Sequence, residues 1–268
     1  MIAFRPITID DRDWMSEKLR EDNRQGCEYS FANNFIWSVI YKVEVAEVCG
    51  CCVIKFDAEG EDCYAFPIGA GDKKAAIMQL LTHAKEDNSK LYIESIEEAD
   101  REFLEKYFSG IFQIEENRDS FDYIYTVDKL TSLAGKKLHG KRNHIARFKD
   151  NEDWSYEPMS DEQCALNQAM KYFDALHLEG GILRKAGEIV AFTIGERLNS
   201  DTYVVHFEKA FPEIQGAYPM INQQFVMHNC QEYSYVNRED DAGDEGLRKA
   251  KLSYYPDILL KNYTAREI

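Results

Sequence analysis

The sequence predicts an α/β fold, because one order of elements occurs twice within its 268 residues. In each half, a strand is followed by a loop of small residues, a helix, a strand, another helix and a further strand. Hydrophobic residues make up 44% of the chain and aromatic residues 13%, enough to bury a substantial core and to exclude a disordered chain. We therefore expect two domains, over residues 1–127 and 128–268, with no long linker between them.

The elements of the first half follow from capping residues, alternation and helical periodicity. Acidic residues at 10–13 precede Trp14 and predict a capped helix, and the sequence at 57–60 predicts a turn between two alternating segments. In order, we expect a helix over 7–25, an aromatic helix leading into a strand over 31–40, strands over 44–56 and 62–67, helix 73–88, strand 91–96, helix 98–108 and a strand pair over 112–127.

The second half repeats this order with different residues. We expect a helix over 131–148, a strand over 154–159 and a helix over 161–176 capped by Ser160. A hairpin over 181–196 turns at Lys185-Ala186-Gly187, and strand 201–210 follows. The remaining elements are a helix from Ala217 to about 229, a strand over 233–236, and a final helix and strand ending near 264.

The charge and the cysteines restrict the classes of function. The formal net charge is −16, with −12 on residues 1–125 and −4 on residues 126–268, so a polyanionic partner requires a local basic patch. Seven cysteines without a secretory signal or a long apolar run indicate a reducing, cytoplasmic setting and no membrane insertion. Cys49, Cys51 and Cys52 lie in a strand pattern without a partner pair at metal-ligand spacing, which favours free core cysteines over zinc.

The stretch from Tyr233 to Pro256 holds the first candidate site. A short aromatic strand ends in Asn237, Arg238, Glu239, Asp240 and Asp241, and a helix with Arg248 and Lys251 follows. In an open α/β sheet, groups at the carboxyl end of a strand face the ligand crevice. The alternative is a solvated turn that carries an ordinary surface ion pair.

Two further segments are the second and third candidates, for ligand binding. Gln215-Gly216-Ala217 opens a helix, where backbone N–H groups attract an anion, although the glycine can also serve only a positive φ. The run from Lys136 to Lys149 contains no acid, and Lys137, Lys141 and His144 share one helical face while Leu138, Ile145 and Phe148 share another. This basic helix predicts a phosphate-bearing ligand or balances the acidic first half.

His206 is the fourth candidate. It lies on a strand with Glu208, and alternation turns both side chains to the same face. A histidine beside a carboxylate acts as a general base in many enzymes. A core histidine with satisfied hydrogen bonds explains the same pattern.

Six blocks together resemble the C-terminal catalytic domain of phosphatidylglycerol lysyltransferases, and more closely the soluble bacterial proteins that share that domain. The blocks are Lys137-Leu138-His139-Gly140-Lys141-Arg142-Asn143, Leu178-Glu179-Gly180-Gly181, His206-Phe207-Glu208-Lys209-Ala210, Gly216-Ala217-Tyr218, Tyr235-Val236-Asn237-Arg238-Glu239-Asp240-Asp241-Ala242-Gly243 and Leu247-Arg248-Lys249-Ala250-Lys251-Leu252-Ser253-Tyr254-Tyr255-Pro256. The resemblance covers nearly the whole chain. It implies two tandem GNAT-like (acetyltransferase-like) domains, each a mixed twisted sheet flanked by helices, with the acyl-transfer site in the second.

This resemblance leads to a first hypothesis, an acyl- or aminoacyltransferase that takes its group from an acyl-CoA or an aminoacyl-tRNA and passes it to an amine or hydroxyl of a small-molecule or peptide acceptor. No covalently bound cofactor and no metal are expected, and the acidic net charge argues against extensive tRNA contact. The expected catalytic residues are Arg238, Glu239, Asp240, Lys251 and His206. The expected donor-binding residues are Gln215, Gly216, Ala217, Lys137, Lys141, Arg142, Asn143, Asn237 and Arg248.

Two features limit what the resemblance implies. No membrane-spanning segment precedes the domain, so a lipid acceptor is not implied, and the link over 157–176 is short for the family. The rival hypothesis is a non-catalytic GNAT-like scaffold for a nucleotide, peptide or protein partner, because a fold does not determine a function. Both hypotheses require the basic helix and the corner after Val236 to meet at one pocket.

Overall fold

A computed structural model describes residues 1–58, 60–150, 153–158 and 167–268. Ser160 and residues 161–166 of the helix predicted over 161–176 therefore lie outside the described residues, while residues 167–171 are helical and residues 172–176 form turns. Within the described part of the chain, two compact units are present. The first comprises residues 1–122, 240–244 and 260–268, and the second comprises residues 123–239 and 245–259.

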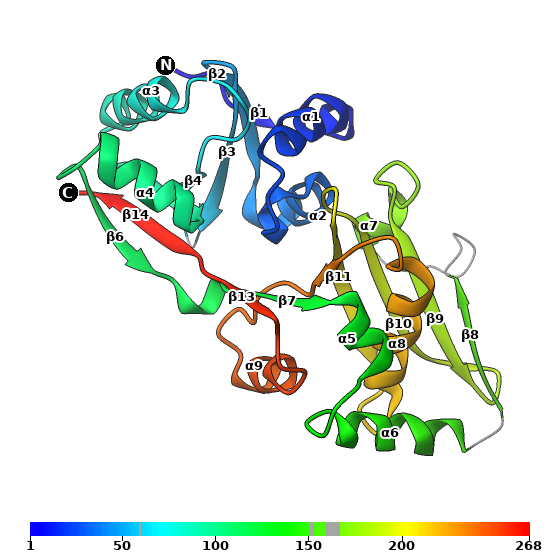
Figure 1. Ribbon diagram of the computed structural model, residues 1–268. Helices are drawn as coiled ribbons and strands as arrows, with labels where there is room; N and C mark the ends of the chain where they lie inside the picture. The colour runs from blue at the N-terminus through cyan, green and yellow to red at the C-terminus, as the bar shows by residue number, and fades with distance from the viewer. Residues whose placement is uncertain (59, 151–152, 159–166) are drawn as a thin grey trace. The chain divides into compact units, whose positions relative to one another are not determined.

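The first unit is built on a seven-stranded mixed sheet of order β1-β2-β3-β4-β5-β14-β6, in which β4 and β5 are parallel. Its helices α3 and α4 follow strands of this sheet (Figure 1). Its elements are β1 (Arg5–Pro6), η1 (Ile9–Asp11), α1 (Arg12–Asp22), η2 (Cys27–Tyr29), α2 (Phe31–Tyr41), β2 (Glu44–Val48), β3 (Cys51–Ala58), β4 (Glu61–Ala65), α3 (Lys73–Glu86), β5 (Tyr92–Ile96), α4 (Glu98–Tyr107), β6 (Phe112–Glu116), η3 (Arg118–Ser120) and β14 (Tyr263–Glu267).

The second unit carries another seven-stranded mixed sheet, of order β13-β7-β12-β11-β10-β9-β8, in which β11 and β12 are parallel. The β9–β10 hairpin forms as the sequence predicted, and Ala186 N in its turn donates to Asp153 O over 2.9 Å. Its elements are β7 (Asp122–Thr126), α5 (Val127–Ser132), α6 (His139–Lys149), β8 (Trp154–Pro158), α7 (Asn167–Lys171), β9 (Glu179–Lys185), β10 (Glu188–Arg197), β11 (Thr202–Ala210), α8 (Ala217–Asn229), β12 (Tyr235–Asn237), α9 (Glu245–Leu252) and β13 (Ile258–Leu260).

Each sheet contains one strand that the chain order alone would assign to the other half. β7 follows β6 directly along the chain, yet it pairs with β12 in the second sheet. β14 closes the chain, yet it lies between β5 and β6 in the first sheet and pairs antiparallel with both. The strand pair expected over 112–127 is therefore wrong, because β6 and β7 belong to different sheets. The compact units accordingly differ from the expected halves at residues 123–127, 240–244 and 260–268.

The helix expected over 131–148 is two helices. Leu133 adopts a left-handed conformation with φ of 48°, and Gly135 follows with φ of 89°, so the chain leaves α5 before α6 begins. The three apolar positions predicted to anchor the basic helix are confirmed, because Leu138, Ile145 and Phe148 are buried.

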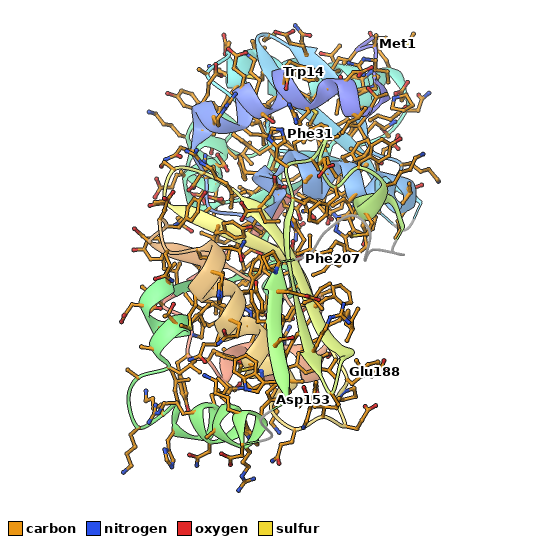
Figure 2. All side chains as sticks on the ribbon, turned by 90° about the vertical axis from the view of Figure 1, so that its right-hand side faces the viewer. Met1, Trp14, Phe31, Asp153, Glu188 and Phe207 are labelled. Atoms are coloured by element: carbon orange, nitrogen blue, oxygen red, sulfur yellow. The ribbon has the colours of Figure 1, made fainter. Side chains whose placement is uncertain are left out.

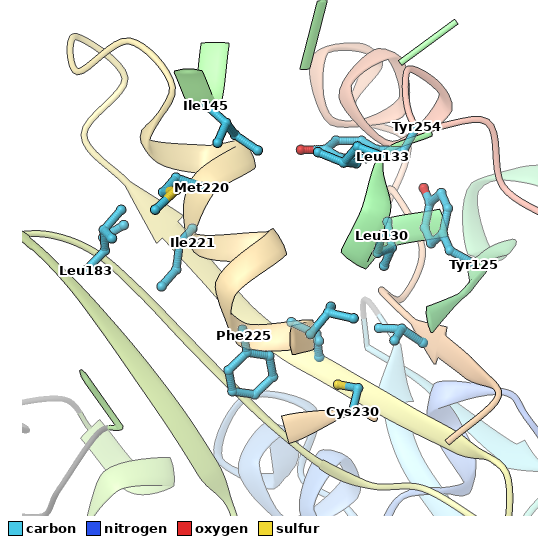
Figure 3. Packing of buried hydrophobic residues seen from close by; sticks show 14 of the residues in the cluster. Tyr125, Leu130, Leu133, Ile145, Leu183, Met220, Ile221, Phe225, Cys230 and Tyr254 are labelled. Carbon is cyan, nitrogen blue, oxygen red and sulfur yellow. The ribbon is translucent and has the colours of Figure 1, made fainter. Parts of the chain in front are cut away.

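The core of the second unit forms where α5, α6 and α8 cover one side of the sheet. Figure 3 shows Met220, Ile221 and Phe225 along α8, with Leu183 on the neighbouring strand, and Leu130 on the other side of α8. Tyr125 and Tyr254 extend the same core and meet edge to face with ring centroids 6.3 Å apart. This apolar packing fixes β11 and α8, and both carry polar side chains discussed below.

The first unit has a core of its own. It includes Tyr64, Phe66 and Leu80, all buried between the sheet and α3. In Figure 2, the labelled residues Trp14 and Phe31 mark α1 and α2 of this unit. Ala265 on β14 is fully buried in this core, so the last strand is an integral part of it.

Deleting residues 261–268 should unfold the first unit. The deletion removes β14 from between β5 and β6 and leaves two strand edges and an apolar face unpaired. We expect loss of amide-exchange protection in β5 and β6, measured by hydrogen–deuterium exchange with mass spectrometry. The control deletes only Ile268, which is 70% exposed. Full protection of β5 and β6 in the longer deletion would show that the sheet does not need this strand.

Candidate functional site

His206 lies at a β-bulge. The register between β10 and β11 pairs Ile194 with Phe207 and Gly195 with Val205, so His206 has no partner residue on β10. A bulge re-aims the side chain of the extra residue. Here the His206 Nδ1 lies 2.8 Å from Glu239 Oε1, and its Nε2 lies 3.3 Å from Glu196 Oε1.

This environment sets the charge of His206. Its side chain is only 2% exposed, and burial by itself lowers the pKa, but the hydrogen bonds and charges of Glu196 and Glu239 outweigh burial and raise the pKa to about 9. At neutral pH the ring is an imidazolium with both N–H groups bound to carboxylates. The expected general-base role therefore lacks the free ring nitrogen that it needs. The geometry instead gives His206 a positioning role toward Glu239.

The corner after β12 is internally satisfied. Asn237 is fully buried and its Oδ1 accepts from Glu239 N over 2.7 Å, which closes a side-chain turn. Glu239 has φ of 57°, a left-handed conformation that costs energy outside glycine. Lys251 holds this corner, because its Nζ donates to Arg238 O at 2.6 Å and to Glu239 O at 3.2 Å. Lys251 is thus a structural cation, and its role as an oxyanion stabiliser stays a prediction.

Arg238 and Glu208 form the buried centre of the site. Arg238 Nη2 donates to Glu208 Oε1 over 2.7 Å, and each side chain is 11% exposed. Burial lowers the Arg238 pKa, but Glu208 and two nearby tyrosines leave it above its ordinary value, so the guanidinium stays charged. Asn222 on α8 donates through Nδ2 to Glu208 Oε2 over 2.9 Å. One carboxylate therefore joins a guanidinium and an amide.

Two atoms beside this carboxylate have no hydrogen-bond partner within the described residues. They are Arg238 Nη1, a donor, and Asn222 Oδ1, an acceptor. The amide orientation is fixed, because a carboxylate accepts only and must face the Asn222 NH2 group. Leaving such buried atoms unpaired costs about 1–3 kcal/mol each. The arrangement suits a ligand that offers both an acceptor and a donor.

Tyr254 brings the basic segment and the corner together. The Lys141 Nζ lies 4.0 Å from the centre of the Tyr254 ring, and the Arg238 guanidinium lies 4.8 Å from it. Burial, and then the repulsion from Arg238, lower the Lys141 pKa to about 8. Burial raises the pKa of the Tyr254 hydroxyl, although Arg238 opposes this, so the phenol is neutral. Two cations on one ring form a site that attracts an anion.

Of the three other predicted residues in the basic segment, one shares the face of Lys141 and two do not. Lys137 joins the same face, because its Nζ lies 4.9 Å from the Tyr255 ring centre. Arg142 does not, since its guanidinium donates to Leu133 O and, over 2.8 Å, to Gly135 O, where it closes the turn before α6. Asn143 is exposed and its Nδ2 lies 3.1 Å from His139 Nε2. Arg142 and Asn143 thus lie apart from the cluster around Tyr254.

The turn at Gln215-Gly216-Ala217 is shaped by packing on α6. Gly216 caps α8 with φ of 90°, and a Cβ there would lie 2.4 Å from His144 O. Gln215 is exposed, with Nε2 3.3 Å from His144 Nδ1. The close approach of α6 explains the glycine, and anion binding at Ala217 stays a prediction.

The last two predicted residues are Asp240 and Arg248. Asp240 belongs to the segment that packs with the first unit, and its Oδ1 accepts from Ala242 N over 3.0 Å. Arg248 lies half-buried on α9 of the second unit. Sequence reasoning missed Asn222 and Tyr254 as site residues. Tyr254 lay within one of the blocks that carry the family resemblance. Asn222 could not be found from spacing, because no rule relates a position on the buried face of α8 to Glu208.

The first unit has a similar strand-to-helix loop after β4, and its own carboxylates occupy it. Gly69 N donates to Asp22 Oδ2 over 3.1 Å, and Ala70 N donates to Glu21 Oε2 over 2.7 Å. Lys73 Nζ also binds both Asp22 oxygens at 2.9 Å. The N–H groups that attract anions at such a loop are thus already used by α1.

The free energy of unfolding should depend on pH through the charge of His206. Because its pKa rises from 6.5 to about 9 on folding, the associated stability is complete below pH 6.5 and is lost as the pH rises through about 9. One such group gives a slope of at most about 1.4 kcal/mol per pH unit. Urea unfolding between pH 6 and 10 should show this slope, and His206→Gln should reduce it. His139→Gln, at an exposed position, is the control; equal slopes in both variants would contradict the assignment.

Comparisons with known proteins agree with this architecture. A crystal structure of a conserved protein from Bacteroides thetaiotaomicron is 36% identical and covers 100% of both chains with a TM-score of 0.94. The C-terminal domain of a putative lysylphosphatidylglycerol synthetase from Agrobacterium fabrum has a TM-score of 0.68 at 12% identity, covering 97% of this chain and 93% of that one. A tandem GNAT protein from the clavulanic acid biosynthesis pathway has a TM-score of 0.50 at 9% identity, covering 99% and 98%.

A curated relative is more distant. An uncharacterised protein of Mycoplasmoides gallisepticum is 22% identical over 182 residues, and the match spans 57% of this chain and 58% of that protein. No helix in the described part of the chain is long and apolar enough to cross a membrane. The described side chains also include no group of three or more histidines, cysteines or carboxylates that could hold a metal ion.

The family model for the C-terminal region of phosphatidylglycerol lysyltransferase matches residues 20–163 and 151–266. These matches cover most of both units. The predicted fold class, two tandem GNAT-like domains with mixed sheets, is confirmed by the structural neighbours and by the two sheets. The family and the fold together support a transferase. The chain belongs to the phosphatidylglycerol lysyltransferase C-terminal family.

Proposed function

We propose that this chain is an aminoacyltransferase whose donor group binds at Arg238, Glu208 and Asn222 in the second unit. The observation that carries the proposal is the pair of unpartnered atoms, Arg238 Nη1 and Asn222 Oδ1. An aminoacyl ester offers a carbonyl oxygen to the guanidinium and an α-ammonium group to the amide oxygen. A simple acyl thioester offers the carbonyl but no ammonium. The geometry therefore favours an aminoacyl-tRNA donor over an acyl-CoA.

The chemistry follows from where charge develops. An amine or hydroxyl of the acceptor attacks the ester carbonyl, a new amide or ester bond forms, and the bond to the tRNA ribose breaks. The ribose oxygen leaves with a proton, which the acceptor supplies in net terms. Negative charge builds on the carbonyl oxygen during attack, and Arg238 Nη1 is positioned to donate to it. Glu208 keeps the guanidinium oriented.

Lys141 adds a second cation beside this carbonyl site. Two cations that share the Tyr254 ring repel each other, and a bound anion relieves this repulsion. A phosphate near the aminoacyl end of the donor has the required charge. Lys137, above Tyr255, extends the same cationic surface toward solvent. The acidic remainder of the chain limits phosphate contacts to this surface.

Substituting Arg238 by lysine tests the carbonyl contact. Lysine keeps the charge but loses the planar fork that binds Glu208 and leaves Nη1 free. We expect kcat/KM for transfer from labelled aminoacyl-tRNA to fall by about 100-fold or more, the usual effect of losing one oxyanion donor. Arg147→Lys, at an exposed position of α6, should leave the rate unchanged.

The assay charges total tRNA with a mixture of labelled amino acids and follows loss of label from tRNA, with acetyl-CoA as the competing donor class. The thermal unfolding midpoint of Arg238→Lys shows whether the variant is folded. Transfer from acetyl-CoA alone would overturn the aminoacyl assignment. A 3′-aminoacylamino-deoxyadenosine analogue that binds the folded chain should raise the free energy of unfolding by about 2.7 kcal/mol at 100 times its Kd. Such stabilisation without any transfer would favour the binding scaffold.

Donor affinity should also depend on pH through Lys141. A bound anion favours the protonated amine of Lys141. A phosphorylated aminoacyl-adenosine that mimics the tRNA 3′ end should therefore bind more tightly at pH 7 than at pH 9, with the change centred near the Lys141 pKa of about 8. Isothermal titration of a phosphorylated aminoacyl-adenosine analogue measures this. Lys141→Arg stays charged over the range and should remove the dependence. A dependence that persists in Lys141→Arg assigns the titration to another group.

A further inference from the structure

The first unit has a solvent-open cavity that the proposed reaction does not use. It lies between the N-terminal segment, β2 and α3, and has a volume of about 470 Å³. Figure 1 shows the N-terminus beside β2 and α3. Ligand pockets for small molecules commonly measure about 300–1,000 Å³. Backbone of the N-terminal segment and apolar residues such as Val48 form part of its wall, and the polar groups come mostly from α3.

His83 supplies an unpartnered atom at this cavity. Its side chain is 8% exposed, and its Nδ1 is buried without a hydrogen-bond partner in the described structure. The other ring nitrogen, Nε2, lies 3.5 Å from Asp87 Oδ2. In the neutral ring, a proton on the nitrogen that faces the carboxylate leaves a lone pair on Nδ1. The cavity therefore contains a buried acceptor that needs a donor.

The neighbouring polar groups are also acceptors. Thr82 Oγ1 donates its proton to Met78 O over 2.9 Å, which leaves only its lone pairs for a ligand. Gln79 directs its NH2 group to Cys49 Sγ over 3.1 Å. Glu47 and Glu86 add two carboxylates from opposite walls, β2 and α3. No lysine or arginine lines the cavity among the described residues.

The structure itself shows that one wall accepts an ammonium group. The Met1 ammonium lies 3.4 Å from Glu86 Oε2. Glu86 is 46% exposed, so this contact is open to exchange with a dissolved cation. Acceptors on both walls and an apolar surface between them require a ligand with donors at both ends and an aliphatic middle.

We propose that this cavity binds a small aliphatic diamine or polyamine, with one ammonium group at Glu86 and His83 and another at Glu47. Ammonium groups are donors only, so they satisfy His83 Nδ1, the Thr82 oxygen and both carboxylates together. Charge-assisted hydrogen bonds of this kind are stronger than neutral ones. The site belongs to the first unit and the residues assigned to group transfer belong to the second, so the site stands independently of the proposed function.

Isothermal titration with 1,4-diaminobutane, at constant ionic strength set by sodium chloride, tests the proposal. We expect binding of one diamine per chain, weakened about tenfold or more by Glu47→Gln with Glu86→Gln. The matched control is Glu17→Gln with Glu102→Gln, which removes the same charge at exposed positions elsewhere in the first unit. It should bind like the unmodified chain. Succinate, a dianion of similar length, should not bind.

His83→Phe provides a second test, in which both carboxylates of the cavity are kept. The ring beside Phe4 is retained, with centroids now 5.5 Å apart, but the buried acceptor is lost. The thermal midpoint should stay the same or rise, because an unpaired polar atom is removed, while diamine affinity falls. If the Glu47/Glu86 variant and the Glu17/Glu102 variant lose diamine affinity equally, the effect comes from the overall −16 charge and the proposal is overturned. Unchanged diamine affinity in His83→Phe would also overturn it.

Discussion

The site depends on one buried ion pair, between Arg238 and Glu208. Isolated charges at such depth are unfavourable, and each partner is tolerable only because the other is present. The pair is not saturated, because Asn222 takes the second carboxylate oxygen and one guanidinium nitrogen is left over. A pair that served only stability would be better replaced by apolar residues of similar volume. The unused nitrogen is therefore the feature on which the proposed donor site rests.

The surrounding residues hold this pair in place. Lys251 fixes the backbone of the corner, and His206 holds Glu239 at its left-handed turn. Residues from the most distinctive block of the sequence thus build the frame, and the same block supplies Arg238, whose Nη1 has no partner among the described residues. A close fit of a motif to a catalytic family does not by itself say which of its side chains touches substrate.

The sequence predicted the fold class and most strands and helices, because alternation and periodicity report local burial. It could not predict the exchange of β7 and β14, since each strand has the same pattern whichever sheet it joins. The break at Leu133 was missed because a left-handed leucine has no signature in the sequence. At the site, Arg238 and Lys141 were identified from their charge. Asn222 was not, because its role depends on the distance from α8 to Glu208.

The position of β14 has a consequence for the newly made chain. The first sheet cannot be completed until residues 263–267 exist, so all of the chain between β6 and β14, including the strands of the second sheet, is synthesised before the core of the first unit closes. Pairing residues separated by this many positions is slow, since a large loop must close first. During translation, β5 and β6 present unpaired edges on either side of the position that β14 later fills. Strands β5 and β6 are thus made before most of the second sheet, yet they reach their final pairing only after it has been synthesised.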